Sequence, residues 1–153
     1  MKDGNIKVGI GFATGRKQFQ RILRSYVYNW KESGLIDDHR VSLDLFVAYD
    51  LKYKNTKRSD YTQMSADVAR LIDGKYFIGI GEVEKIKSEL ADQGVASPEE
   101  LSLIFGSGYA AQRNIILYYA LKNNIDYLLF LDDDEYPMAA TRNRDTVIWS
   151  GQH

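Results

Sequence analysis

One apolar segment of the chain runs directly into a cluster of carboxylates. Residues 127–131 are apolar, and residues 132–135 follow them as Asp-Asp-Asp-Glu. A short continuous apolar segment predicts a strand buried on both faces of a parallel sheet, and open α/β sheets bind ligands at the carboxyl ends of such strands. Adjacent carboxylates repel one another, and a hard divalent cation would relieve that repulsion. The cluster therefore predicts a metal-assisted site for a phosphate-containing ligand. The alternative interpretation is a solvated acidic turn after a core strand.

The spacing within this cluster suggests which carboxylates share a ligand. Alternate residues of an extended segment point the same way, so Asp132 and Asp134 are predicted to converge on one Mg²⁺ or Mn²⁺ ion. Such an ion takes carboxylate, water and phosphate oxygens. Asp133 is expected to face elsewhere, toward Arg113 or a ribose.

The elements that position this cluster alternate between strand and helix. The predicted strands are Lys7–Phe12, Val41–Tyr49, Tyr76–Ile80, Tyr127–Leu131 and Thr146–Trp149. The predicted helices are Phe19–Trp30 with Gly34 beyond its end, Ser65–Ile72, Glu82–Leu90, a short helix from Pro98 to about Phe105, and Tyr109–Lys122. Residues 51–60 are polar and basic and are expected to form an exposed loop. This alternation predicts an α/β fold, a Rossmann-like three-layer sandwich with a mainly parallel sheet.

Parallel strands would bring three loops to one edge of the sheet: residues 13–16, Asp50 and the acidic cluster. Arg16 could pair with a diphosphate through its planar guanidinium, although a solvated Arg is the alternative. Asp50 could accept hydrogen bonds from a base or a ribose. Arg113 lies early in a predicted helix, where free N–H groups and the helix dipole favour anions; the alternative there is a surface Arg. The sequence contains neither a dinucleotide fingerprint nor a P-loop.

Composition restricts the class of protein further. The chain has 153 residues and a formal net charge of −1, which argues against a general nucleic-acid binder. It contains no cysteine, so disulfides and thiolate metal sites are excluded. No apolar stretch has the length of a transmembrane segment or a signal peptide. A single domain over residues 1–153 and a cytoplasmic location are expected.

Three segments together resemble GT-A fold glycosyltransferases, especially family 2. Residues 8–16, Val-Gly-Ile-Gly-Phe-Ala-Thr-Gly-Arg, resemble the opening strand and loop of that family. Residues 108–114, Gly-Tyr-Ala-Ala-Gln-Arg-Asn, resemble its small-residue–Arg–Asn segment, and residues 127–134 resemble its strand and DxD motif. The resemblance implies that Thr14 and Arg16 line the nucleotide pocket and that Asp50 contacts the base. It also implies that Arg113 helps to bind the donor, and that the acidic cluster holds ribose and metal.

The expected function follows from this resemblance. It implies a nucleotide-sugar donor, most simply a UDP-sugar, a hydroxyl acceptor and a divalent ion that stabilises the leaving diphosphate. Gly15 departs from the family, which often has a larger polar residue there. Such enzymes also continue into an acceptor-binding half, so we expect this chain to be the donor-binding portion, with the catalytic base outside it. The alternatives are a phosphatase of the haloacid dehalogenase type, which also has an Asp-x-Asp after an apolar strand, and a nucleotide- or cation-binding module without turnover.

Overall fold

The computed structural model describes residues 6–52, 55–143 and 146–151. Its centre is a four-stranded parallel sheet with the strand order β3-β2-β1-β4. The strands are β1 (Ile6–Thr14), β2 (Val41–Tyr49), β3 (Gly74–Ile78) and β4 (Tyr127–Leu131). β1 pairs with β2 on one side and with β4 on the other, so the carboxyl ends of the strands lie at one edge of the sheet.

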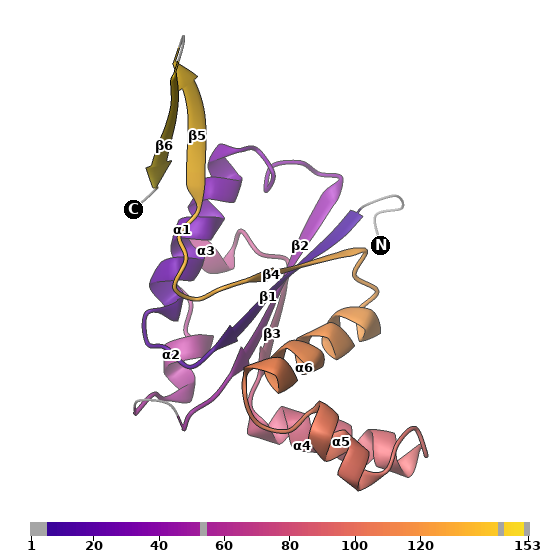
Figure 1. Ribbon diagram of the computed structural model, residues 1–153. Helices are drawn as coiled ribbons and strands as arrows, with labels where there is room; N and C mark the ends of the chain where they lie inside the picture. The colour runs from indigo at the N-terminus through magenta and orange to yellow at the C-terminus, as the bar shows by residue number, and fades with distance from the viewer. Residues whose placement is uncertain (1–5, 53–54, 144–145, 152–153) are drawn as a thin grey trace.

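Helices cover both faces of this sheet (Figure 1). The first face carries α1 (Phe19–Glu32), α2 (Arg58–Thr62) and α3 (Ala66–Ala69), and the second carries α4 (Ile80–Asp92), α5 (Pro98–Ile104) and α6 (Tyr109–Lys122). Each face has its own cluster of buried apolar side chains. The predicted three-layer α/β sandwich is therefore confirmed. Within the described part of the chain, no helix is long and apolar enough to cross a membrane.

The helix α1 shows why the sequence pattern was informative. Its apolar side chains recur at steps of three and four, and those that face the sheet are fully buried, among them Phe19, Leu23 and Val27. The helix ends at Glu32, and Gly34 follows in the left-handed conformation with φ 78°. A residue without Cβ adopts that conformation at little cost, as predicted for the residue after the helix.

Several element boundaries differ from the prediction. β1 continues through Ala13 and Thr14, because both residues stay in register with the end of β2. The strand expected at 76–80 lies at 74–78, and Ile80 already begins α4. The Glu82 carboxylate accepts the backbone N–H of Gly79 at 2.9 Å and so fixes this helix start.

In two further segments, the secondary structure differs from the one that was predicted. The helix α2 begins at Arg58, inside the segment expected to be a loop, where Asp60 accepts the backbone N–H of Lys57 at 2.7 Å. The weak helix expected over 65–72 is reduced to the single turn α3. The capping contact of Asp60 fixes the start of α2.

The prediction that β4 is buried on both faces is wrong. β4 is an edge strand of the sheet, and the side chains of Tyr127 and Leu129 are 62% and 48% exposed. Leu128 and Phe130 point to the other face and pack in the cluster under α6. Tyr127 and Leu129 pair with Val8 and Ile10 of β1, and their exposure shows that the helices on this face do not cover the edge strand.

The final described segment forms a separate hairpin-like pair. β5 (Met138–Asn143) and β6 (Thr146–Gly151) are antiparallel and form their own two-stranded sheet. The strand predicted at 146–149 is thus present, whereas β5 was not predicted.

Candidate functional site

The parallel register brings three strand ends together. Thr14 is the last residue of β1, Asp50 follows β2, and Asp132 follows β4. The backbone N–H of Asp50 donates to the carbonyl of Thr14 at 3.1 Å, which ties the first two loops to each other. The residues singled out from the sequence therefore do lie at one edge of the sheet, where open α/β folds bind ligands.

Asp133 is the buried member of the acidic cluster. Its side chain is 10% exposed, and its carboxylate accepts the Thr14 hydroxyl at 2.5 Å. The Arg16 guanidinium lies 3.4 Å from the other carboxylate oxygen. Asp133 was expected to face Arg113 or a ribose; its side chain contacts Thr14 and Arg16 and not Arg113, and the ribose contact stays a prediction. Asp133 therefore joins the first loop to the acidic cluster.

Asp132 takes the position beside α6. Its carboxylate accepts a short hydrogen bond from the Tyr109 hydroxyl and one from Arg113 at 3.1 Å. The same Arg113 nitrogen donates to the Tyr109 oxygen at 2.9 Å. Burial raises the pKa of Tyr109, and its hydrogen bond to Asp132 raises it further, against a smaller lowering by Arg113. The hydroxyl therefore stays protonated at neutral pH and acts as a donor to Asp132.

Arg113 is held in place before any ligand arrives. Its guanidinium carbon lies 4.7 Å from the Tyr109 ring centre and 5.2 Å from that of Phe130, both within cation–π distance. Its Nε is buried and has no hydrogen-bond partner within the described residues. A planar cation fixed at the start of α6 suits the binding of a carboxylate or a phosphate.

Asp134 points to a different cation from Asp132. It pairs with Arg16 at 2.9 Å, and both side chains are about half exposed, at 50% and 48%. The oxygens of Asp132 and Asp134 have the right chemistry for Mg²⁺ or Mn²⁺, but each carboxylate is paired with its own arginine. Among the described residues, no group of three acidic or histidine side chains is arranged to hold a metal. The site as placed is thus an alternation of carboxylates and guanidinium groups rather than a formed metal centre.

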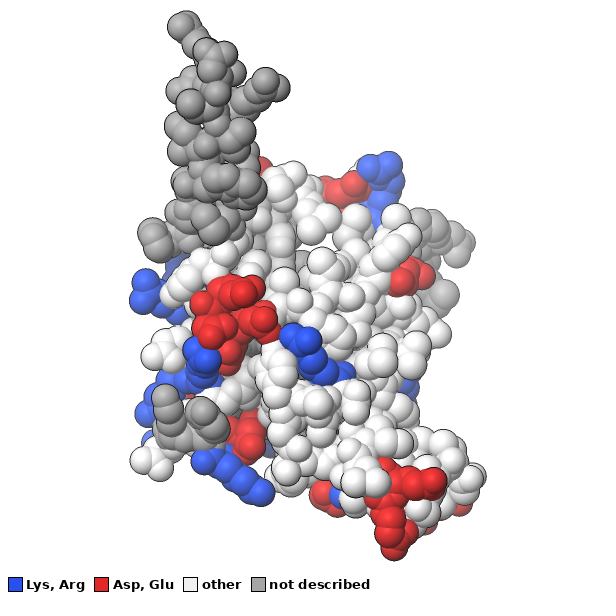
Figure 2. Space-filling view, in the orientation of Figure 1, with Lys and Arg blue, Asp and Glu red and all other residues white. Residues whose placement is uncertain are grey.

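The cluster still carries excess negative charge. Three of the four carboxylates at 132–135 pair with two arginines, which leaves two negative charges that these ion pairs do not balance, and Lys17 lines a further cavity beside Asp133 and Asp134. Figure 2 shows the corresponding acidic patch, with basic atoms close to it on both sides. An incoming anion would add to this excess, so the charge balance favours recruitment of a further cation.

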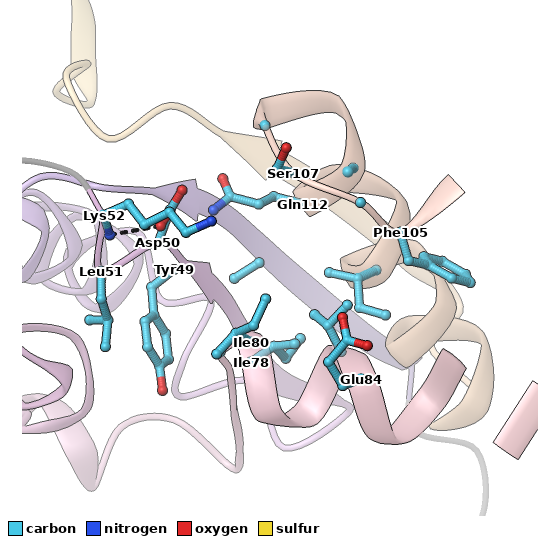
Figure 3. A pocket seen from close by; sticks show the side chains of 17 residues that line it. Tyr49, Asp50, Leu51, Lys52, Ile78, Ile80, Glu84, Phe105, Ser107 and Gln112 are labelled. Atoms are coloured by element: carbon cyan, nitrogen blue, oxygen red, sulfur yellow. Dashed lines mark hydrogen bonds between the residues drawn. The ribbon is translucent and has the colours of Figure 1, made fainter. Parts of the chain in front are cut away.

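Two adjoining cavities open at this edge of the sheet. The first, of about 350 Å³, is lined by polar groups that include Thr14, Arg16, Tyr109 and Asp133. The second, of about 330 Å³, lies between the ends of β2 and β3, the start of α4 and the loop before α6, and its walls are mainly apolar (Figure 3). The residues Asp50, Gly108 and Gln112 line both cavities.

Two residues that line the site, Tyr109 and Gln112, were not predicted from the sequence. Both lie in the first turn of α6, after Gly108 with φ 98°. Tyr109 stands four residues before Arg113, the spacing at which helical side chains meet, and that spacing could have revealed it. Asn114, quoted with Arg113 in the resembling segment, instead donates to the carbonyl of Ile104 at 2.9 Å and holds α5 against α6.

Comparison with known proteins adds no identification to this geometry. No protein-family model matches the chain, and neither the curated proteins nor the solved structures contain a significant match to it. A functional proposal must therefore rest on the site itself.

Proposed function

We propose that this chain binds a nucleoside diphosphate and is the donor-binding portion of a nucleotide-sugar-dependent glycosyltransferase. The observation that carries the proposal is the pair of adjoining cavities at the carboxyl edge of the parallel sheet. One cavity is polar and includes a guanidinium group, and the other is apolar. A nucleotide has the same division between a charged diphosphate and a flat, mainly apolar base.

The diphosphate is assigned to the polar cavity. Arg16 lines it, and Arg113 lies beside it through its contacts with Tyr109. Gly108 and Tyr109, at the start of α6, line the same cavity. Helix N-termini and arginine side chains both favour anions, and α6 is long enough, at 14 residues, to present a helix dipole.

The base and ribose are assigned to the region around Asp50. One oxygen of the Asp50 carboxylate accepts the backbone N–H of Lys52 at 2.8 Å, which orients the side chain and leaves its second oxygen available. The apolar cavity beyond it is lined by side chains such as Ile78, Val83 and Phe105. Its volume suits a small planar group. Asp133 is assigned to the ribose side of the polar cavity, where it lies against Thr14.

The proposed reaction is attack by an acceptor hydroxyl on the anomeric carbon of the donor sugar, with departure of the nucleoside diphosphate. The arginines of the site would stabilise negative charge on the leaving group, as preorganised cations do in such reactions. A divalent ion, when bound, would supply the same kind of stabilisation. No residue of the chain is assigned as the catalytic base.

Binding of UDP tests the proposal directly. We expect calorimetric titration to show UDP binding to the wild-type chain, and Arg113→Gln to weaken that binding about tenfold to a hundredfold, the range for a charged hydrogen bond. Arg70→Gln is the matched control, because Arg70 is exposed and lines neither cavity. Its UDP affinity should equal that of wild type.

The opposite results are equally clear. Absence of binding by every nucleoside diphosphate would overturn the proposal, and so would equal affinities of the Arg113→Gln and Arg70→Gln variants. Circular dichroism of each variant checks that the fold is intact.

A binding module without turnover is the second candidate function. It is favoured by the ion pairs themselves, since Asp132 and Asp134 are both occupied by arginines rather than free to act on a substrate. Incubation of the chain with UDP-sugars separates the two functions. Release of UDP, by hydrolysis or transfer, supports the enzyme, whereas binding without release supports the module.

A further inference from the structure

Gln112 occupies the junction of the two cavities. It lies in the first turn of α6 and lines the polar cavity and the apolar cavity alike. In Figure 3 its amide points away from α6 toward Asp50. Within the described residues, this amide has no hydrogen-bond partner in the protein, whereas Asp132, Asp133 and Asp134 each pair with another side chain. The amide is thus positioned at the junction and is not tied to another group of the described protein.

Asp50 faces this amide from the end of β2 and completes a polar pair. Its carboxylate is fixed by the Lys52 backbone N–H and has a second oxygen that can only accept hydrogen bonds. The Gln112 amide can both donate and accept. Together, Asp50 and Gln112 present hydrogen-bond acceptors and one donor group at the mouth of a cavity that is otherwise mainly apolar.

The walls of that cavity are mainly apolar, and their polar side chains include Lys52, Glu84 and Ser107, which line this cavity and not the polar one. Apolar side chains contribute affinity in proportion to the area they cover, and every base offers a similar flat surface to them. Discrimination between bases of similar size needs polar groups that a wrong base would leave unpaired. Of the residues that line both cavities, Asp50 and Gln112 alone carry polar side chains, since the third is Gly108.

We infer that Gln112 is a specificity-determining residue, which reads the hydrogen-bonding edge of the nucleotide base together with Asp50. This inference rests on the proposed function, because it requires the apolar cavity to be the base pocket. It deepens that function by assigning base selection to α6 rather than to the strand ends alone. Gln112 carries no charge, so we expect the diphosphate to depend on Arg16 and Arg113 even though Gln112 also lines the polar cavity.

A nucleotide panel tests the inference. The dissociation constants of UDP, CDP, GDP, ADP and inorganic pyrophosphate are measured for the wild-type chain and for Gln112→Ala. In wild type the four nucleotides should differ, with UDP expected to bind most tightly under the proposed function. In Gln112→Ala the affinity for UDP should fall about threefold to tenfold, as for loss of one hydrogen bond, and the four nucleotides should become more alike. Pyrophosphate affinity should not change.

Two further variants sharpen the result. Gln93→Ala is the matched control, since Gln93 is exposed at the far end of α4 and lines neither cavity. Its nucleotide ranking should equal that of wild type. Gln112→Glu keeps the size of the side chain and removes its donor, so it should also disturb the ranking, because two adjacent carboxylates cannot donate to a base carbonyl.

The outcomes separate this inference from the proposed function. If wild type binds no nucleoside diphosphate, the proposed function fails. If wild type binds nucleotides with a clear ranking and Gln112→Ala leaves that ranking unchanged, the inference fails and the proposed function stands. An equal loss of pyrophosphate and UDP affinity would also overturn the inference, since it would place Gln112 at the phosphates.

Discussion

At the scale of single residues, the site is an alternation of opposite charges. Arg113 lies between Asp132 and two aromatic rings, and Arg16 bridges Asp133 and Asp134. Exposed ion pairs contribute little to stability, so the partly exposed pairs of this cluster are expected to add little to the free energy of folding. Under the proposed function, a phosphate or a metal that binds here would exchange these partners.

The expected requirement for a divalent ion follows from the charge balance. Because two negative charges remain uncompensated and a diphosphate adds more, we expect Mn²⁺ to increase the affinity of the wild-type chain for UDP. Asp134→Ala should remove most of that increase while leaving the fold intact, since Asp134 is half exposed. Calorimetric titration of UDP with Mn²⁺ and with a chelator measures both effects.

Asp92→Ala provides the control, because Asp92 is an exposed carboxylate at the end of α4. Identical responses to Mn²⁺ in wild type and Asp134→Ala would contradict the assignment of Asp134 as a metal ligand.

At the scale of elements, one buried carboxylate joins two neighbouring strands. Asp44 of β2 is 7% exposed and accepts the backbone N–H of Gly74, the first residue of β3, at 2.9 Å. A Cβ at Gly74 would lie 2.6 Å from this carboxylate, so glycine permits the close approach. Burial raises the pKa of Asp44, against smaller opposing effects that begin with the Gly74 hydrogen bond.

This raised pKa predicts a pH dependence of stability. The folded state binds the Asp44 proton more tightly than the unfolded state, whose carboxyl titrates near 3.8. The contribution of Asp44 to stability is therefore complete below that pH and is lost as the pH rises through the folded pKa. Asp44→Asn keeps an oxygen acceptor for Gly74 and cannot ionise. The free energy of unfolding of this variant should therefore decrease less with rising pH than that of wild type. Urea unfolding between pH 4 and pH 7 measures the difference.

The control for this titration is Asp92→Asn, which changes an exposed carboxylate and should retain the wild-type profile. If Asp44→Asn and wild type lose the same stability over this range, the burial of a charged Asp44 is not the cause.

At the scale of the whole molecule, the two cavities depend on how closely α6 packs against the sheet. Gly11 of β1 lies under this helix, and a Cβ there would lie 2.8 Å from Ile116 and 3.2 Å from Phe130. Both neighbours belong to the elements that carry Arg113 and the acidic cluster. The absence of a side chain at Gly11 thus allows α6 and β4 to pack closely at this position.

Two glycine substitutions should have opposite effects. Gly11→Ala overpacks this interface and should reduce the free energy of unfolding by about 1–3 kcal/mol, and displacement of α6 should weaken UDP binding as well. Gly81→Ala is the matched control: Gly81 lies early in α4 with open space around its Cβ position. It should raise stability by up to about 1 kcal/mol through helix propensity. Urea unfolding of both variants provides the measurement, and a stabilised Gly11→Ala protein would contradict the packing described here.

The fold could be predicted from the sequence to a large extent because its signals are local. Periodic apolar side chains and the Gly34 that follows them predicted α1. The helix α6 and the strand β4 have the boundaries that their sequence patterns predicted. The convergence of Thr14, Asp50 and Asp132 also followed, since parallel strands end at one edge. These inferences need only period, length and chain direction.

The tertiary structure alone decided which partner each functional side chain has. No pattern in the sequence places Asp133 against Thr14 or Asp132 against Tyr109, because these contacts join residues 119 and 23 positions apart. The same holds for the exposed face of β4, which depends on what lies beside the strand. The sequence by itself thus determined the acidic cluster at the end of a parallel strand. Only packing between distant segments determined that arginines hold its carboxylates and that Gln112 lies between two cavities.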